Sequence, residues 1–391
     1  MYQRLLKPSA NNSFLLFGAR GTGKTTFVHS QFFSATSPSL SINLLQPNEY
    51  DRYIRNPGEL SAALDALRPK KRGRQWVMID EIQRVPELLN VVHEKIETGK
   101  WLFALTGSSA RKLKRGAANL LAGRAFVYHL FPLTDAELGP DFNLQKSLEW
   151  GTLPKVYTLK NTADRMEFLN SYTQTYLKEE IQEEQLVRKM RPFRNFMDVA
   201  AQCSGTIINY SNIARDCGTD PVSIQSYFEI LADTMLGFEL PPFHQSIRKR
   251  QRKNPKFYLF DLGVKRALDG SLGTPLRPAT SAFGMHFEHW VIQEAVRMSS
   301  YSRKNYRFSY LRTRDDVEID LIVERPGQPL TLIEIKSTTS VRENDLASFS
   351  RIAAEFPGAK KFCLSRDPLR KHIGEVECLP FTNLAEALGL S

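Results

Sequence analysis

The residues with the clearest chemical meaning form the stretch GARGTGKTT, at 18–26. It matches the pattern G-x-x-x-x-G-K-[ST], in which glycines let backbone N–H groups wrap a chain of phosphates. Lys24 is expected to reach the β- and γ-phosphates of ATP, and the Thr25 hydroxyl to bind Mg²⁺. The predicted nucleotide contacts are Gly18, Ala19, Arg20, Gly21, Thr22, Gly23, Lys24, Thr25 and Thr26.

A second candidate pair is Asp80-Glu81, at the end of the apolar run in WVMIDEIQR (76–84). Beside a phosphate-binding loop, an aspartate at this place holds Mg²⁺ through water, and the adjacent glutamate orients and polarises the attacking water. The same pair is also a common way to begin a helix. Together with Lys24, the spacing favours ATP hydrolysis.

Two further residues are weaker candidates for the same reaction. Ser108 follows a strand pattern in LTGSS (105–109) and is placed to contact the γ-phosphate or the attacking water; Thr106 and Ser109 are alternatives, and turn formation alone explains all three. Arg124 precedes the next strand pattern. An arginine there can stabilise transition-state charge in a neighbouring subunit, although surface arginines are common.

Acids and one lysine near the C-terminus form another constellation. Glu288 lies in the helical pattern at 284–296, Asp320 in an alternating strand pattern, and Glu334 and Lys336 in the next strand. Carboxylates are the oxygen ligands that Mg²⁺ prefers, and the metal activates water for attack on a phosphate. The predicted metal ligands are Glu288, Asp320 and Glu334, with Lys336 beside them. His286 and His289 are interpreted as helix-surface or core residues.

The first 130 residues contain the elements that must position the ATP residues. Short apolar runs alternate with helical patterns, as expected of a three-layer, mainly parallel α/β sheet. The expected strands are 13–18, 40–44, 75–80, 101–107 and 124–130, and the expected helices include 24–33, 58–67 and 87–97. A long helix at 163–190 is expected to end at Pro192.

The middle of the chain, at 208–240, reads as helix, tight turn, helix and strand. Ile213 and Ala214 are expected to pack inward, Cys217-Gly218 to form the turn, and Pro221 to lie in the second helix's first turn. Strands at 237–243 and 256–261 would flank a basic segment, giving a winged helix. The predicted phosphate contacts are Arg248, Lys249, Arg250, Arg252 and Lys253. Such modules also dock proteins.

The composition agrees with a folded protein that has a polyanionic partner. The net charge is +11, and basic residues cluster at 68–74, 110–115 and 247–253. The four cysteines show no zinc spacing and are expected to be reduced. No apolar run reaches the roughly 18 residues of a membrane span, and the N-terminus has no signal peptide pattern, so the predicted location is the cytoplasm, without a membrane partner.

The ordered motifs GARGTGKTT, MIDEIQ, LTGSS, LAGR, FPLTDAEL, GTLP, YTQTYLKEEI, FEHWVIQE, VEIDLIV and IEIK resemble one family. It comprises the AAA-type ATPases of bacteria and archaea with a restriction-endonuclease-like C-terminal domain. The resemblance implies an AAA+ ATPase core (1–134), a helical connector (135–192), a winged helix (193–275) and a PD-(D/E)xK-type domain (276–391). It gives Asp320, Glu334 and Lys336 the core motif positions and Glu288 the helix acid, although Val-Glu-Ile before Asp320 replaces the motif's proline.

Three functions follow as hypotheses. The leading one is an ATP-driven machine on duplex or junction DNA that works as a homo-oligomer, by analogy a hexameric ring, with ATP and Mg²⁺ as cofactors. Its C-terminal domain would bind DNA, and cleavage stays an open question. The second is a nucleotide-controlled signalling or defence switch with a nuclease-like effector domain. The third is a protein-remodelling ATPase.

Overall fold

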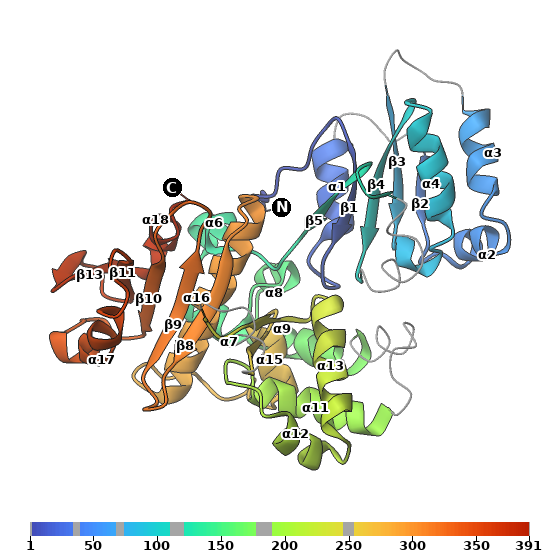
Figure 1. The fold of residues 1–391 in the computed structure, drawn as a ribbon. Coiled ribbons are helices and arrows are strands. Elements are labelled where there is room, and N and C mark those ends of the chain that lie inside the picture. Colours follow the sequence, from blue (N-terminus) through green and yellow to red (C-terminus); the bar gives the residue numbers. More distant parts are fainter. Residues whose placement is uncertain are drawn as a thin grey trace. The chain divides into compact units, whose positions relative to one another are not determined.

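The computed structural model describes residues 2–33, 40–67, 74–109, 121–176, 190–244 and 254–390. Most residues of the basic runs at 68–74, 110–115 and 247–253 lie outside the described residues. They include every predicted phosphate contact at 248–253. The chain divides into two compact units, which are described separately (Figure 1). The first unit comprises Met1–Pro132 and Ile230–Leu236, and the second comprises Leu133–Glu229 and Gly237–Ser391.

A five-stranded parallel sheet forms the centre of the first unit, with the strand order β2-β3-β4-β1-β5. The five predicted strands are therefore confirmed. Since β4 lies between β1 and β3, its carboxyl end is placed between the ends that carry Gly18 and Asp80. The strands are β1 (Ser13–Phe17), β2 (Leu40–Asn43), β3 (Gln75–Asp80), β4 (Trp101–Gly107) and β5 (Ala125–His129).

Helices cover both faces of this sheet, which gives the expected three layers. Leu15 and Phe17 face a core shared with the buried side chains of α2, α3 and α4. Phe14 points to the other face, where its ring lies 5.1 Å from that of Phe32 in α1. The alternation follows from the period of two in a strand. The helices are α1 (Lys24–Phe32), α2 (Pro47–Arg55), which the sequence analysis did not predict, α3 (Glu59–Ala66) and α4 (Leu88–Glu97).

Helices dominate the first part of the second unit. The expectation that Pro192 ends a helix is wrong, because Pro192 lies near the start of α11. A proline is tolerated there, since the first turn of a helix needs no N–H donors. The predicted helix at 163–190 is described only up to Tyr176. The helices are α6 (Asp135–Leu138), α7 (Leu144–Trp150), α8 (Pro154–Thr158), α9 (Thr162–Ser171), α11 (Met190–Gln202) and α15 (Leu262–Leu268).

The predicted pair of helices in the middle of the chain is confirmed. Helix α12 (Tyr210–Cys217) ends at Gly218, which adopts a left-handed conformation with φ 66°, and α13 (Pro221–Asp233) begins at the predicted proline. Ile213 and Ala214 are buried. Strands β6 (Gly237–Leu240) and β7 (Lys256–Leu259) follow and pair antiparallel.

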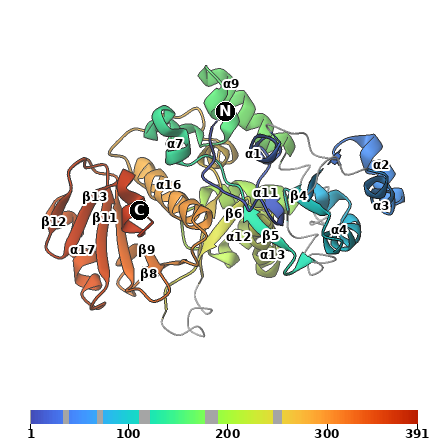
Figure 2. The ribbon, with the colours of Figure 1, turned by 90° about the horizontal axis from the view of Figure 1, so that it is seen from above.

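A six-stranded mixed sheet forms the rest of the second unit, with the order β12-β13-β11-β10-β9-β8. Its strands are drawn in orange and red in Figure 2. Strands β8, β9 and β10 are antiparallel neighbours, whereas β10, β11 and β13 run parallel. The strands are β8 (Arg307–Arg312), β9 (Glu318–Glu324), β10 (Thr331–Lys336), β11 (Lys360–Ser365), β12 (Lys371–Ile373) and β13 (Val376–Pro380).

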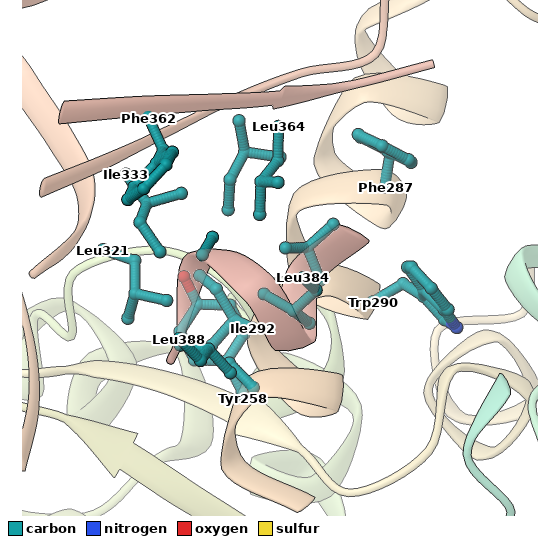
Figure 3. Packing of buried hydrophobic residues seen from close by; sticks show 14 of the residues in the cluster. Tyr258, Phe287, Trp290, Ile292, Leu321, Ile333, Phe362, Leu364, Leu384 and Leu388 are labelled. Carbon is teal, nitrogen blue, oxygen red and sulfur yellow. The ribbon is translucent and has the colours of Figure 1, made fainter. Parts of the chain in front are cut away.

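Three helices pack on this sheet: α16 (Ser281–Tyr301), α17 (Glu343–Ala353) and α18 (Leu384–Ala387). The core shared with α16 and α18 includes Leu321 and Ile333, and Figure 3 shows these side chains beside Ile292 and Leu384. A second core joins Ile322 and Leu332 to α17. The two cores lie on opposite faces, because neighbouring residues of a strand point to opposite sides.

A β-bulge interrupts β9 at Asp320. Ser309 of β8 pairs with Ile322 and Leu311 pairs with Ile319, so Tyr310 faces both Asp320 and Leu321. Ile319 packs in the α17 core, whereas Leu321 packs in the α16 core. The regular alternation expected of this strand is therefore wrong at Leu321, because a bulge shifts the alternation by one residue.

Candidate functional sites

The phosphate-binding loop connects the end of β1 to the start of α1, as the motif requires. Gly21 and Gly23 have φ values of 81° and 90°, which favour glycine. A Cβ at Gly18 would lie 2.3 Å from the carbonyl oxygen of Leu130. The loop therefore depends on its glycines, and the following helix presents its N-terminus, where backbone N–H groups favour phosphate.

Lys24 is the first residue of α1, directly after this loop. Its Nζ donates a hydrogen bond to the Gly18 carbonyl oxygen at 2.8 Å and lies 4.0 Å from Oε1 of Glu81. The lysine is buried, which keeps its ammonium close to the backbone that would surround a phosphate chain. Lys24 lies at the start of α1, and Glu81 directly follows β3. The fold thus brings the two residues together, as predicted.

Asp80 is held between two hydroxyl groups. Thr25 Oγ1 donates to Asp80 Oδ2 at 2.8 Å, and Thr106 Oγ1 donates to Oδ1. Thr106 also accepts a hydrogen bond from the N–H of Glu81 at 3.3 Å. Hydroxyl and carboxylate oxygens are the ligands that Mg²⁺ prefers, so Thr25 and Asp80 fit the magnesium ion that accompanies a nucleotide.

Glu81 has a left-handed backbone, with φ 58°, and its carboxylate is held by Gln83. Gln83 Nε2 donates to Glu81 Oε2 at 2.5 Å and to Ser108 Oγ at 3.0 Å. Ser108 was predicted from the sequence, whereas Gln83 was not. Its place two residues after Glu81, in the short 3₁₀ helix Ile82–Arg84, was the available signal.

Arg124 does not join these residues within one chain. It precedes β5, which runs parallel to β1 with Ala125 beside Ser13. Arg124 therefore lies at the edge of the sheet opposite to the phosphate-binding loop. There it is exposed and forms an ion pair with Glu97.

In the second unit, Glu288, Glu318 and Asp320 form an acid cluster, with one carboxylate oxygen of each within 4.8 Å of the others. A lysine that the sequence analysis missed lies among them: Nζ of Lys256, the first residue of β7, is 3.0 Å from Glu288 Oε1 and pairs more closely with Glu318. Tyr258 OH also donates to Glu288 Oε1, at 3.0 Å.

Glu334 and Lys336 form a neighbouring pair, with Nζ 2.6 Å from Oε1 of Glu334. Burial raises the pKa of Glu334, and Lys336 opposes that shift. Burial, followed by the charge of Glu334, raises the pKa of Asp320 well above its usual value. Asp320 Oδ2 accepts the N–H of Ile335 at 2.7 Å. The charges of the predicted ligands Asp320 and Glu334 thus affect each other. The three carboxylates that lie closest to one another, however, are those of Glu288, Glu318 and Asp320, without Glu334.

The two histidines beside Glu288 have structural roles. His286 Nδ1 lies 2.7 Å from the Ala282 carbonyl oxygen, and His289 Nε2 lies 2.8 Å from that of Leu259. Burial lowers the pKa of His286 to about 4. Both histidines are buried, so they are core residues, which is one of the two expected alternatives.

The fold of the first unit and its loop geometry define a P-loop nucleotide-binding domain. Residues 10–139 match the family described as an AAA domain. The N-terminal part of the chain is therefore similar to an AAA domain and contains a P-loop. Residues 141–275 and 283–384 match two domains of unknown function, DUF8612 and DUF4143.

Longer stretches of the chain are similar to known proteins, at lower identity. An uncharacterized protein of Mycobacterium tuberculosis is 26% identical over 360 residues, which cover 90% of this chain and 78% of that protein. The ORC2 protein of Aeropyrum pernix is 15% identical with a TM-score of 0.27, covering 68% of this chain and 89% of that one. A DNA polymerase III gamma subunit-related protein of Thermotoga maritima is 13% identical with a TM-score of 0.28, covering 74% and 96%.

Among the described residues, no helix has both the length and the apolar character that crossing a membrane requires.

Proposed function

We propose that this chain hydrolyses ATP as a homo-oligomer, such as a hexameric ring, and couples hydrolysis to the binding and remodelling or translocation of DNA. The observation that carries the proposal is the convergence of Lys24, Thr25, Asp80 and Glu81 at the carboxyl ends of β1 and β3. These residues supply the phosphate contact, the metal ligands and the group that orients water in P-loop ATPases.

Each residue of the site has a separate task in this proposal. The loop at 18–23 and the N-terminus of α1 would hold the phosphates of ATP, and Lys24 would offset their negative charge. Bound Mg²⁺ supplies further positive charge for the transferred phosphoryl group. Glu81 orients the attacking water, and Gln83 fixes its carboxylate through the hydrogen bond at 2.5 Å. Ser108 in turn accepts a hydrogen bond from Gln83.

The position of Arg124 supports a homo-oligomer. Because Arg124 lies at the sheet edge opposite to the loop, it is far from a phosphate bound by its own chain. A role in stabilising the transition state therefore requires a second copy, whose phosphate site Arg124 would approach. The exposure of Arg124 leaves it accessible for that contact.

DNA binding is supported by two features of the chain and by the net charge of +11. The α12–α13 pair followed by the β6–β7 hairpin has the order of a winged helix, with the basic segment 245–253 between the two strands. In the larger sheet, α16 precedes three antiparallel strands, and α17 connects β10 to the parallel strand β11. This is the arrangement expected for a restriction-endonuclease-like domain, with Glu288, Asp320, Glu334 and Lys336 near one another.

A nucleotide-controlled switch with a nuclease-like effector is a second candidate. One observation favours it: a lysine fills the space among Glu288, Glu318 and Asp320, where a nuclease would bind its metal. A domain held in this way would need a signal before it could cleave.

The deciding experiment measures ATP turnover with single-stranded, duplex, forked and four-way-junction DNA, and scores nicking in the same reactions. Stimulation of turnover by DNA is the expected result. Weak basal turnover with nucleotide-dependent assembly would favour the switch. Absence of DNA binding at low salt would refute both and leave a protein-remodelling ATPase.

A further inference from the structure

The acid cluster of the second unit already contains a cation. Lys256 Nζ lies 3.0 Å from Glu288 Oε1 and is paired with Glu318, and its side chain is only 6% exposed. Asp320, the third acid, has an oxygen within 4.8 Å of those of the other two. An ammonium group at this place has the carboxylate neighbours that a divalent metal ion would need.

The surroundings hold the lysine in place from several sides. Its Nζ lies 5.6 Å from the centre of the Tyr310 ring, a distance at which the ring's negative face attracts a cation. Tyr310 is the residue opposite the bulge in β9 and therefore borders Asp320. The Tyr258 hydroxyl donates to the same oxygen of Glu288 as Lys256 does. The site is thus built from β7, β8, β9 and α16.

The adjacent carboxylate of Glu334 has capacity for another cation contact. One of its oxygens is bonded by Lys336, while Oε2 is buried without a hydrogen-bond partner, and the residue is 7% exposed. Burying a carboxylate oxygen without a partner costs free energy. Glu334 thus resembles an incomplete ligand beside Asp320.

We propose that Lys256 is a resident cation that keeps the Glu288–Glu318–Asp320 cluster closed to divalent metal ions, so that the cluster becomes a metal site when the lysine is withdrawn. Two cations cannot share the same oxygens at these distances, because their repulsion in a partly buried site is large. Lys256 is the first residue of β7, so withdrawal of its side chain at the start of that strand is the step that opens the site.

This inference rests on the proposed nuclease-like domain and adds its control: the hairpin strand β7 determines whether metal binds. It does not depend on ATP hydrolysis, since Lys256 lies in the second unit and the nucleotide residues lie in the first. Metal binding and ATP turnover therefore report on the two proposals separately.

The test measures Mn²⁺ binding to the full-length, nucleotide-free protein by calorimetry and by thermal unfolding. Mn²⁺ is an oxygen-preferring probe that replaces Mg²⁺ well. Lys256→Gln removes the charge and keeps hydrogen-bond donors for Glu288 and Glu318. We expect it to bind Mn²⁺ on the order of a hundredfold more tightly than the unmodified protein, because one cationic charge is gone. Saturating Mn²⁺ should raise its midpoint by about 5 °C.

Three controls make the result specific. Lys256→Arg keeps the charge and should bind Mn²⁺ as weakly as the unmodified protein. Lys265→Met breaks another partly buried ion pair of the same unit, that with Asp269 at 2.8 Å, and Mn²⁺ should not restore its stability. Adding Asp320→Asn to Lys256→Gln should abolish the gain.

Two results would overturn the proposal. One is Mn²⁺ binding by the unmodified protein that is as tight as in Lys256→Gln and is lost with Asp320→Asn. The other is a folded Lys256→Gln variant without tighter binding. If Lys256→Gln does not fold in chelator, recovery of the native circular dichroism spectrum on adding Mn²⁺ is the expected result, and failure to recover contradicts the proposal. DNA-stimulated ATP turnover, measured on the same samples, tests the proposed function independently.

Discussion

The two units each combine a buried lysine with carboxylates, but they arrange them differently. In the first unit, Lys24 donates to a backbone carbonyl oxygen at 2.8 Å and keeps 4.0 Å from Glu81. Asp80 is bonded by the hydroxyls of Thr25 and Thr106. In the second unit, Lys256 contacts the carboxylates of Glu288 and Glu318 directly.

This difference determines what each site can accept. A hydroxyl that donates to a carboxylate can rotate and become a metal ligand, since its oxygen has lone pairs. An ammonium has no lone pair and must leave before a metal enters. Hydroxyl partners thus leave the first site ready for Mg²⁺ and ATP, whereas the ammonium partner makes the second site stable and closed.

The largest expected effect is on turnover in the first unit. Lys24→Ala removes the charge that offsets the phosphates, so ATP turnover should fall below detection while the protein stays folded. Phosphate release and circular dichroism measure the two properties. Lys100→Ala, which changes an exposed lysine, is the control. Continued hydrolysis by Lys24→Ala would show that the ATP site has been placed wrongly.

A change of Arg124 tests whether a second copy of the chain completes the ATP site of the first unit. Arg124→Ala should lower turnover about a thousandfold. Its ion pair with Glu97 is exposed to solvent, which screens the attraction, so the unfolding midpoint should hardly move. Glu97→Ala breaks the same ion pair and keeps Arg124, and should therefore retain turnover.

Mixing inactive chains separates this role from a structural one. Arg124→Ala chains keep an intact loop, and Lys24→Ala chains keep the arginine. Turnover should therefore return in a mixture of the two, measured by phosphate release at fixed total protein. No recovery in mixed oligomers would contradict a contribution of Arg124 to a neighbouring site.

In the second unit, Lys256 should contribute to the stability of the fold and not to ATP turnover. Lys256→Met leaves Glu288 and Glu318 without their shared cation, and such a loss in a buried pair costs about 3 kcal/mol. Lys336→Met is a matched change at a lysine whose side chain is 35% exposed and contacts one carboxylate, so it should cost less than Lys256→Met. Urea unfolding in chelator measures both. Equal losses would show that the Lys256 contacts add little, which would weaken the comparison between the sites.

Much of the first site could be predicted because its chemistry is local in sequence. The loop glycines, Lys24 and Thr25 are consecutive, and Asp80-Glu81 directly ends an apolar strand. Parallel strands then bring these ends to one edge of the sheet. The strand pattern also predicted the five-stranded sheet. Helix α2 was not predicted, because most of its residues are polar and its buried side is short and centred on Tyr53.

The second site could be predicted only in part, because its partners are distant in sequence. Glu288 and Asp320 follow from helix and strand patterns. The place of Lys256 cannot be predicted in this way, since nothing in its own segment indicates that its side chain forms ion pairs with acids of α16 and β9. The bulge at Asp320 is equally hidden, because the alternation Val317-Glu318-Ile319-Asp320-Leu321 predicts a regular strand. Contacts between segments distant in sequence determine both the position of Lys256 and the bulge.

The smallest effect concerns the hydroxyl that holds Asp80. Thr106→Val preserves shape but removes the donor to Asp80 and the acceptor for the Glu81 N–H. Groups that orient a metal ligand in this way are worth about ten- to a hundredfold in metal affinity. The Mg²⁺ concentration for half-maximal turnover should therefore rise about tenfold, measured at saturating ATP.

Thr106→Ser is the matched control, because serine keeps the hydroxyl and loses only a methyl group. It should retain most of the Mg²⁺ affinity. If valine and serine behaved alike, the hydroxyl contacts of Asp80 would not prepare the first site for metal. The contrast with the ammonium contacts of the second site would then rest on Lys24 and Lys256 alone.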